Sequence, residues 1–210
     1  MLRIKRRILF LTLGLCLVLA SCRPSSAGPG PSPTPGGPTQ TLDAAQFDAL
    51  LAQQPLSVES ASYVVQDSHY KALFPDMLQA TVRNNTGGTV TKAVVAFAAW
   101  DINGNPVAIE AKYDFIRGFY IREVTFQDIQ VPDGGTFGER YGFKVEEACR
   151  IARIKAIAVR CETSEGETWT NPCYDAWLQL YEGVGFSESQ TVEAPLEWTE
   201  GTAPPAPSPT

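Results

Sequence analysis

The apolar residues that follow position 40 first recur at helical spacing. They are Ala44, Phe47, Leu50 and Leu51. Thr41 stands before them and has a side chain suited to an N-cap, and Pro55 ends the pattern. We therefore expect a short amphipathic helix over residues 42–53, within a segment 41–55 that packs on the edge of a domain.

From residue 56 onward the pattern changes to one that is typical of β-strands. Six segments are rich in β-branched and aromatic residues: 58–65, 77–83, 90–100, 107–115, 119–126 and 151–161. Clusters of turn-forming residues separate them, at 84–88, 101–106, 132–135 and 164–167. About seven short strands with frequent turns are therefore predicted.

Two of these segments differ in how their apolar residues are arranged. Residues 77–83 alternate, with Leu78, Ala80 and Val82 on one face, as in a half-solvated antiparallel strand. Residues 93–100 are apolar throughout, which favours either a central strand covered on both faces or the best-buried strand of a sandwich.

A second helix is expected after the last hairpin. Asn171 is a capping residue, Pro172 suits the first helical position, and Gly183 ends the pattern. The apolar stripe consists of Tyr174, Trp177, Leu178 and Tyr181. We interpret it as core rather than as a binding site.

No long helical segments separate the predicted strands, which argues against a βαβ fold. The fold class predicted is mainly β: an immunoglobulin-like antiparallel β-sandwich with a short N-terminal and a short C-terminal helix. The sandwich would occupy residues 56–186, and residues 187–210 would form an extended, partly disordered tail.

The beginning of the chain resembles a bacterial lipoprotein signal. Four basic residues in the first seven lead into the apolar run 8–19, which is shorter than the roughly 20 residues that span a bilayer. The run ends in Leu19-Ala20-Ser21-Cys22, which resembles a lipobox. We expect residues 1–21 to be removed and Cys22 to carry diacylglyceryl and acyl chains such as palmitate. An ordinary secretory signal with an incidental cysteine is the alternative.

Residues 22–40 are rich in Pro, Gly, Ser and Thr and would form a semi-extended tether. Loss of the signal removes four of the 17 basic residues and leaves 13 against 23 acidic ones, a formal net charge of −10. This charge argues against nucleic acid as a partner. The expected location is therefore the outer face of a cell membrane, held by the lipid on Cys22.

Several segments resemble a family of uncharacterised secreted domains common in Firmicutes. They are Tyr70 to Ala80, Asn84-Asn85, Ala93 to Asp101, Asn103 to Pro106, Ile154 to Val159, and Trp169, Asn171-Pro172 and Trp177. The resemblance covers residues 56–183. It implies extracellular placement and an immunoglobulin-like sandwich, and because the family is a domain of unknown function, it supplies no functional residues.

The residues that carry catalytic chemistry are few. His69 is the sole histidine, so a metal site with two histidines is excluded. Asp101-x-Asn103-x-Asn105 resembles the start of a calcium loop, but Pro106 and Lys112 replace the glycine and glutamate that such a loop needs. We expect a hairpin turn there. No catalytic residue, metal ligand or cofactor is assigned.

Three cysteines remain after Cys16 and Cys22, and an odd number cannot all pair within one chain. A disulfide between Cys161 and Cys173 is one prediction, with Cys149 either free or the true partner. Three aromatic residues, Phe115, Phe119 and Tyr120, are candidates for a platform that binds a glycan or a peptide. Burial at the edge of the sandwich is the reading we favour for them.

The leading functional hypothesis is a non-enzymatic interaction module whose partner is an envelope protein or polymer. One alternative is an envelope hydrolase with carboxylates drawn from Asp114, Glu123, Asp128 and Glu139. The other is a passive accessory subunit of a transporter.

Overall fold

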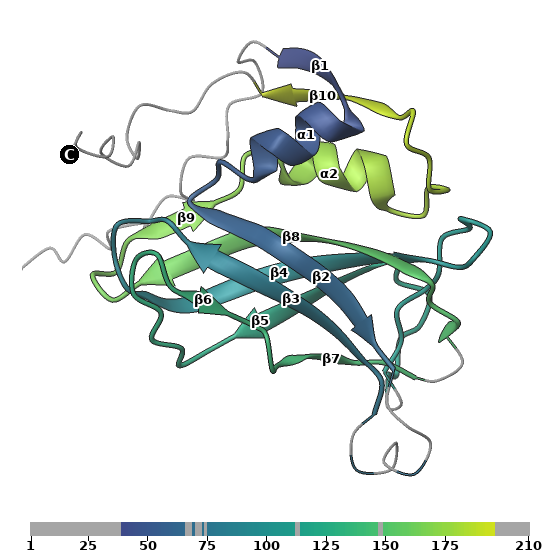
Figure 1. Ribbon diagram of the computed structural model, residues 1–210, viewed down its shortest axis with the longest axis horizontal. Coiled ribbons are helices and arrows are strands. Elements are labelled where there is room, and N and C mark those ends of the chain that lie inside the picture. The colour runs from purple at the N-terminus through teal and green to yellow at the C-terminus, as the bar shows by residue number, and fades with distance from the viewer. Residues whose placement is uncertain are drawn as a thin grey trace, which may run out of the picture. The chain divides into compact units, whose positions relative to one another are not determined.

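The computed structural model describes residues 39–65, 69, 73, 75–111, 114–146 and 149–195. The predicted signal peptide, Cys22, most of the tether and residues 196–210 lie outside this part. The described chain is mainly β, with three antiparallel sheets and two short helices (Figure 1). Neither helix in these ranges has the length and apolar content needed to cross a membrane.

The elements follow one another in a simple order. The strands are β1 (Thr39–Asp43), β2 (Leu56–Val64), β3 (Met77–Asn84), β4 (Val90–Trp100), β5 (Ile121–Phe126), β6 (Thr136–Phe137), β7 (Gly142–Lys144), β8 (Arg153–Thr163), β9 (Thr168–Thr170) and β10 (Thr191–Pro195). The helices are α1 (Ala44–Leu51) and α2 (Tyr174–Tyr181).

The strands form one small sheet and two larger ones. In the β2–β3 sheet, β3 pairs with β2 on one side and with β6 and β7 on the other. In the β4–β8 sheet the order is β5-β4-β8-β9. The small sheet joins β1 to β10, with Thr39 opposite Pro195 and Asp43 opposite Thr191.

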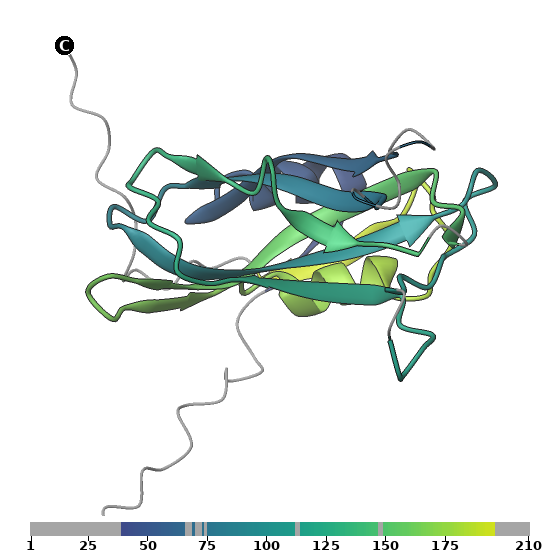
Figure 2. The ribbon, with the colours of Figure 1, turned by 90° about the horizontal axis from the view of Figure 1, so that it is seen from below.

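The two larger sheets face each other around a first apolar core (Figure 2). The alternation predicted for residues 77–83 places Leu78, Ala80 and Val82 in this core. The facing side chains of β4 are Ala93, Val95, Phe97 and Ala99. Burial of such side chains contributes about 25 cal/mol per Å² of apolar surface.

The opposite face of the β4–β8 sheet is covered by α1, α2 and the small sheet, which enclose a second core. The other side chains of β4 enter it: Val94, Ala96, Ala98 and Trp100. Phe47 of α1 and Trp177 of α2 pack there, both almost fully buried. The run 93–100 is therefore apolar because β4 is covered on both faces, which confirms the central-strand reading.

Helix α1 begins later than predicted. Asp43 is the N-cap, and its side chain accepts a hydrogen bond from the backbone of Gln46 at 2.8 Å. The Gln46 side chain accepts in return from the Asp43 backbone at 3.0 Å, which completes a capping box. Thr41 is not the cap because it belongs to β1, where its hydroxyl donates to Glu193.

Helix α2 also begins later than its predicted cap. Its N-cap is Cys173, and the Asn171 side chain accepts from the Cys173 backbone at 2.9 Å. Trp177 and Tyr181 of the predicted stripe are buried, as the core interpretation required.

Several predicted strands need correction. No strand forms over the described residues of 107–115, because the Val107 and Ile109 amides bond to Ala99 and Phe119 within a folded-back loop. The predicted tail from residue 187 contains β10, which pairs with β1. The short strands β6 and β7 were not anticipated from the sequence, whereas β9 forms the expected last hairpin with β8.

Candidate functional site

The connection from β4 to β5 carries an exposed apolar surface. We call its described residues Val107–Ala111 and Asp114–Tyr120 the aromatic loop. Phe115 is fully exposed, Ile116 is 70% exposed and Phe119 is 47% exposed. Tyr120 is 39% exposed. The burial expected for Phe115, Phe119 and Tyr120 is therefore wrong, because they precede the edge strand β5 instead of lying within it.

A network of charges fixes the backbone of the aromatic loop. Asp114 accepts a hydrogen bond from the Ala111 amide at 2.8 Å and forms an ion pair with Arg122 of β5. Arg122 also donates to the carbonyl of Ile109 at 3.0 Å. Charge-assisted bonds of this kind are among the stronger ones in proteins. The loop is therefore tied to the sheet at its base.

Two aromatic rings lie close to the Arg122 guanidinium. The guanidinium carbon lies 4.6 Å from the centre of the Phe143 ring and 5.8 Å from that of Phe119. Both distances lie within the range of cation–π attraction. Arg122 thus links the loop to β5 and to β7 of the facing sheet.

A second charge cluster braces the other limb of the loop. The Glu110 carboxylate lies 3.1 Å from Arg117 and accepts from the Gly118 amide at 3.3 Å. Arg117 also lies 3.6 Å from Glu146. Gly118 has a φ of 91°, a conformation that favours glycine. The tip that carries Phe115 is thereby held between two anchored limbs.

Other connections meet the aromatic loop at the same end of the sheets. The Glu146 amide donates to the Glu110 carbonyl at 2.8 Å, and the Val145 amide donates to the Asp76 carbonyl at 2.9 Å. Further exposed apolar side chains lie in connections at this end: Val65, Leu73 and Ile102. We call this region the loop end. Exposed apolar side chains that occupy several connections at one end of the sheets make this end a candidate interaction surface.

The acids proposed for a hydrolase do not form a shared site. Asp114 is used in the ion pair described above, and Glu123 accepts a hydrogen bond from the Tyr174 hydroxyl at 2.9 Å. Glu139 bonds within its own turn after β6, and Asp128 lies in the connection after β5. The structure gives each carboxylate a different neighbourhood, so the geometry lends no support to paired acid and base.

The three described cysteines are free thiols. Cys161 lies in the first core and Cys173 in the second. The predicted disulfide is not formed because these two side chains pack into cores on opposite faces of the β4–β8 sheet. Burial raises the pKa of both thiols to about 11. Burial, together with Glu110 and Glu146, also raises the pKa of Cys149.

The turn after β4 explains the apparent calcium motif. The Asp101 carboxylate accepts from the Asn103 amide at 2.8 Å and from the Asn105 amide at 2.8 Å. The Asn105 side chain donates to it as well, at 3.0 Å, and these bonds lower the pKa of Asp101. The carboxylate closes its own hairpin turn.

Within the described ranges, no cluster of three or more His, Cys, Asp or Glu residues could hold a metal ion. His69 is an exposed turn residue.

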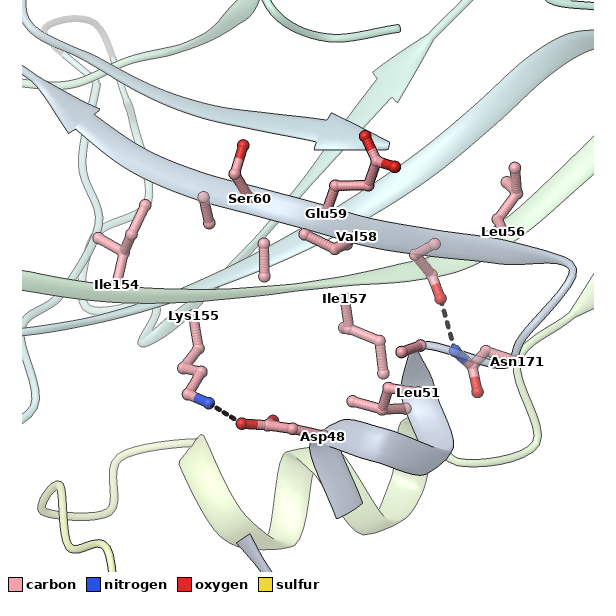
Figure 3. A pocket seen from close by; sticks show the side chains of 14 residues that line it. Asp48, Leu51, Leu56, Val58, Glu59, Ser60, Ile154, Lys155, Ile157 and Asn171 are labelled. Atoms are coloured by element: carbon pink, nitrogen blue, oxygen red, sulfur yellow. Dashed lines mark hydrogen bonds and ion pairs between the residues drawn. The ribbon is translucent and has the colours of Figure 1, made fainter. Parts of the chain in front are cut away.

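A pocket of about 290 Å³ lies between α1, β2 and β8 (Figure 3). Its walls include the half-buried side chains of Leu51, Val58 and Ile154. The Lys155 ammonium and the Asp48 carboxylate, 2.5 Å apart, form an ion pair on its α1 side. No sequence pattern indicated this pocket, because its walls come from segments about 100 residues apart.

The polar side chains around this pocket serve the fold. The Asn171 amide donates to the Ala158 carbonyl at 2.8 Å and accepts from Cys173. Glu59 forms an ion pair with Arg83. The pocket thus has mixed apolar and polar walls whose Asp48, Lys155, Glu59 and Asn171 side chains are already paired, which suits binding better than acid–base chemistry.

The model of a family of unknown function, DUF5780, matches residues 77–184, just over half of the 210-residue chain. The chain belongs to this family. The match runs from β3 to the end of α2, so the DUF5780 region includes both larger sheets except β2. The expectation of a domain of unknown function is confirmed.

A hypothetical protein from Peptoclostridium difficile 630, known from an X-ray structure, has a similar fold. The TM-score is 0.51 at 11% identity, and the match covers 64% of this DUF5780 chain and 94% of the other chain. At this identity the likeness concerns the fold alone. None of the curated proteins compared with the chain matches it.

Proposed function

We propose that this DUF5780 protein is an extracytoplasmic lipoprotein, held in a membrane through acylated Cys22, that works as a non-enzymatic interaction module. In this proposal the fold is an immunoglobulin-like sandwich, and its loop end binds an envelope protein or polymer. The basic and apolar signal, the lipobox and the tether support the anchor. Two facing antiparallel sheets support the sandwich.

One observation carries the binding part of the proposal: Phe115 is fully exposed on a loop that two charge clusters hold in place. Full burial of a Phe or Ile side chain is worth roughly 1.5–3 kcal/mol, so Phe115 and Ile116 together offer about 3–6 kcal/mol to a partner. A braced loop loses little conformational entropy on binding, so more of this energy remains as affinity.

The experiment is site-specific photo-crosslinking in cells, with the crosslinking amino acid at Phe115 of the intact lipoprotein. A Phe115→Ser/Ile116→Ser variant, with the crosslinker moved to Phe119, should lose the adduct. Tyr141→Ser is the matched control, because Tyr141 is as exposed as Ile116 but lies in the connection between β6 and β7, outside the loop end. A Cys22→Ala strain should lose both the membrane fraction and the adduct.

The two parts of the proposal fail separately. A Cys22→Ala protein that stays in the membrane fraction contradicts lipid anchoring. A Phe115→Ser/Ile116→Ser protein that crosslinks as well as the native protein contradicts binding through the aromatic loop.

A further inference from the structure

Strand β8 is paired along only part of its outer edge. Its inner edge pairs with β4 along its whole length, from Arg153 to Thr163. On the outer edge, β9 pairs with Arg160–Glu162, and beyond Thr170 the chain turns away toward α2. Among the described strands, none pairs with residues 153–158 on this side. About half of the β8 edge is therefore open.

Two independent hydrogen bonds show which backbone groups face this open edge. The Ala158 carbonyl accepts from Asn171, which lies on the outer side. The Ala99 carbonyl accepts from Val107 on the β5 side, so its neighbours along β4 face β8. The backbone groups of a strand alternate between its two edges, and Ile154 lies opposite Ala99 in the β4–β8 register. Both observations therefore place the N–H and C=O groups of Ile154 and Ala156 on the outer edge of β8.

The open edge lies at the bottom of a slot. The pocket of Figure 3 has β2 on one side and α1 on the other, with Ile154, Ala156 and Ala158 of β8 between them. A second hollow of about 350 Å³ continues it along residues 61–63 and 152–155. The two hollows share Ala61, Ile154 and Lys155. We call the combined groove the edge slot.

We propose that the edge slot binds an extended peptide of a partner protein, which adds to β8 as a strand in line with β9. An unpaired strand edge is complementary to another extended backbone, and strand addition is a common mode of peptide recognition. Six residues of β8 at about 3.3 Å each give roughly 20 Å, the length of an ordinary strand. This site is distinct from the aromatic loop and does not depend on it.

Asn171 shows how the added strand begins. Its backbone amide donates to the Val159 carbonyl at 2.8 Å, and its side-chain amide donates to Ala158 at 2.8 Å. The side chain thus stands where the next peptide group of β9 would lie if the chain did not turn into α2. The ladder of donors to β8 stops there, and Ala156 and Ile154 are the next acceptors along the edge.

The walls of the edge slot define the chemistry of the peptide. Successive side chains of an added strand point to opposite faces. One set would contact Val58 and Ala61 of β2, and the other would contact Leu51 of α1 and Ile157 of β8. Asp48 and Lys155 also line the α1 side, and Glu59 and Ser60 the β2 side. The peptide therefore needs medium-sized apolar side chains only where it faces Val58, Ala61, Leu51 and Ile157.

Two features of the slot limit edge-to-edge pairing of β8 with other protein chains. Lys155 stands on the α1 side, held by Asp48, and β2 has a bulge between Val58 and Ser60. Lysines and bulges at edges are typical protections against aggregation. They leave the outward backbone groups of Ile154 and Ala156 available to a single peptide.

The first test is amide hydrogen exchange of the full-length chain, resolved by residue. The amides of Ile154 and Ala156 should exchange at least about a hundredfold faster than those of Lys155 and Ile157, which bond to β4. Equal protection of all four amides would show that the edge is already covered and would overturn the proposal.

The second test uses a displayed library of linear eight-residue peptides, selected on the full-length chain, followed by synthesis of the selected sequences. A selected peptide should slow the exchange of Ile154 and Ala156 by tenfold or more. The same peptide N-methylated at alternate residues should bind at least tenfold more weakly, because it lacks the donors of a strand. A library that yields no peptide protecting these two amides overturns the proposal, and so does an N-methylated peptide of equal affinity.

A variant of the chain completes the design. Ala156→Pro removes an outward N–H while it leaves the β4 ladder intact, and it should weaken peptide binding at least tenfold. Ala156→Ser is the matched control and should bind normally. The N-methylated peptide keeps the test decisive if Ala156→Pro does not fold. Binding that survives in Phe115→Ser/Ile116→Ser separates this site from the aromatic loop.

Discussion

The side chain of Asn84 provides the sharpest test of how this fold is held together. It lies at the end of β3 and is fully buried. Its amide nitrogen donates to the carbonyls of Gly88 at 2.8 Å and Val131 at 2.9 Å. Its oxygen accepts from the amide and the hydroxyl of Thr86, at 2.9 and 2.7 Å. All four hydrogen-bonding positions of the side-chain amide are occupied.

Asn84→Asp keeps the shape of this side chain and removes both of its donors. The Gly88 and Val131 carbonyls then each lose one donor and face a carboxylate oxygen, although Val131 still accepts from the Val90 amide and Gly88 from the Thr86 hydroxyl. Each hydrogen bond replaced by such a contact costs roughly 1–3 kcal/mol. We expect the free energy of unfolding to fall by about 3–5 kcal/mol. Asn85→Asp is the control, because the half-buried Asn85 donates only to the Ser57 hydroxyl at 3.2 Å, which can itself donate to a carboxylate. It should cost less than about 1 kcal/mol.

The measurement is urea unfolding followed by tryptophan fluorescence, repeated between pH 4 and pH 7. Burial among carbonyls would raise the pKa of the introduced aspartate above its unfolded value of about 3.9. A group with a raised pKa stabilises the fold below the unfolded pKa and loses that effect as the pH rises. The defect of Asn84→Asp should therefore shrink toward pH 4. A loss below about 1 kcal/mol at pH 7, with the fold intact, would refute the reasoning.

Three further predictions concern other parts of the fold. Arg122→Ala should free the aromatic loop, with at least tenfold faster hydrogen exchange at the Ile109 amide; unchanged exchange would show that the ion pair and ring contacts do not brace it. Asp43→Ala should remove the α1 cap and cost about 1 kcal/mol in urea unfolding, whereas Thr41→Ala, outside the helix, should cost less. Burial raises the pKa of Cys161 and Cys173 to about 11 from 9.0, so the unfolded state loses its protons first and stability should fall as the pH rises from 9 to 11. The Cys161→Ala/Cys173→Ala variant should show a shallower fall in alkaline unfolding curves, and an identical slope would contradict the assignment.

The pattern of apolar residues along the sequence correctly predicted β3, β4 and the two helices. Residues 77–83 alternate because β3 has one face on the first core, and β4 is apolar throughout because it has a core on each face. The fully apolar pattern left two readings open, and the helices and small sheet behind β4 decide between them. Both helices were also predictable. The sequence has Asp43 followed three residues later by Gln46, which is the capping-box pattern that marks the observed start of α1.

The remaining errors come from contacts between distant segments. The apolar residues of 107–115 suggested a strand, yet Val107 and Ile109 are placed by bonds to Ala99 and Phe119 that close a loop. Pairing of β1 with β10 joins segments 152 residues apart, and neither segment has a strong strand pattern. The exposure of Phe115 depends on charge pairs that hold its loop away from the core. Residue type alone indicated an aromatic candidate but not its exposure.

The antiparallel pairing of β1 with β10 holds the first and last described strands of the domain side by side. Thr39 lies opposite Pro195, so the chain enters and leaves the domain about one strand spacing apart, roughly 4.8 Å. In Figure 1 the β10 arrowhead points to the left, away from the loop end. A unit built in this way can be moved as a cassette into a surface loop of a host protein, or repeated in tandem, without covering the aromatic loop.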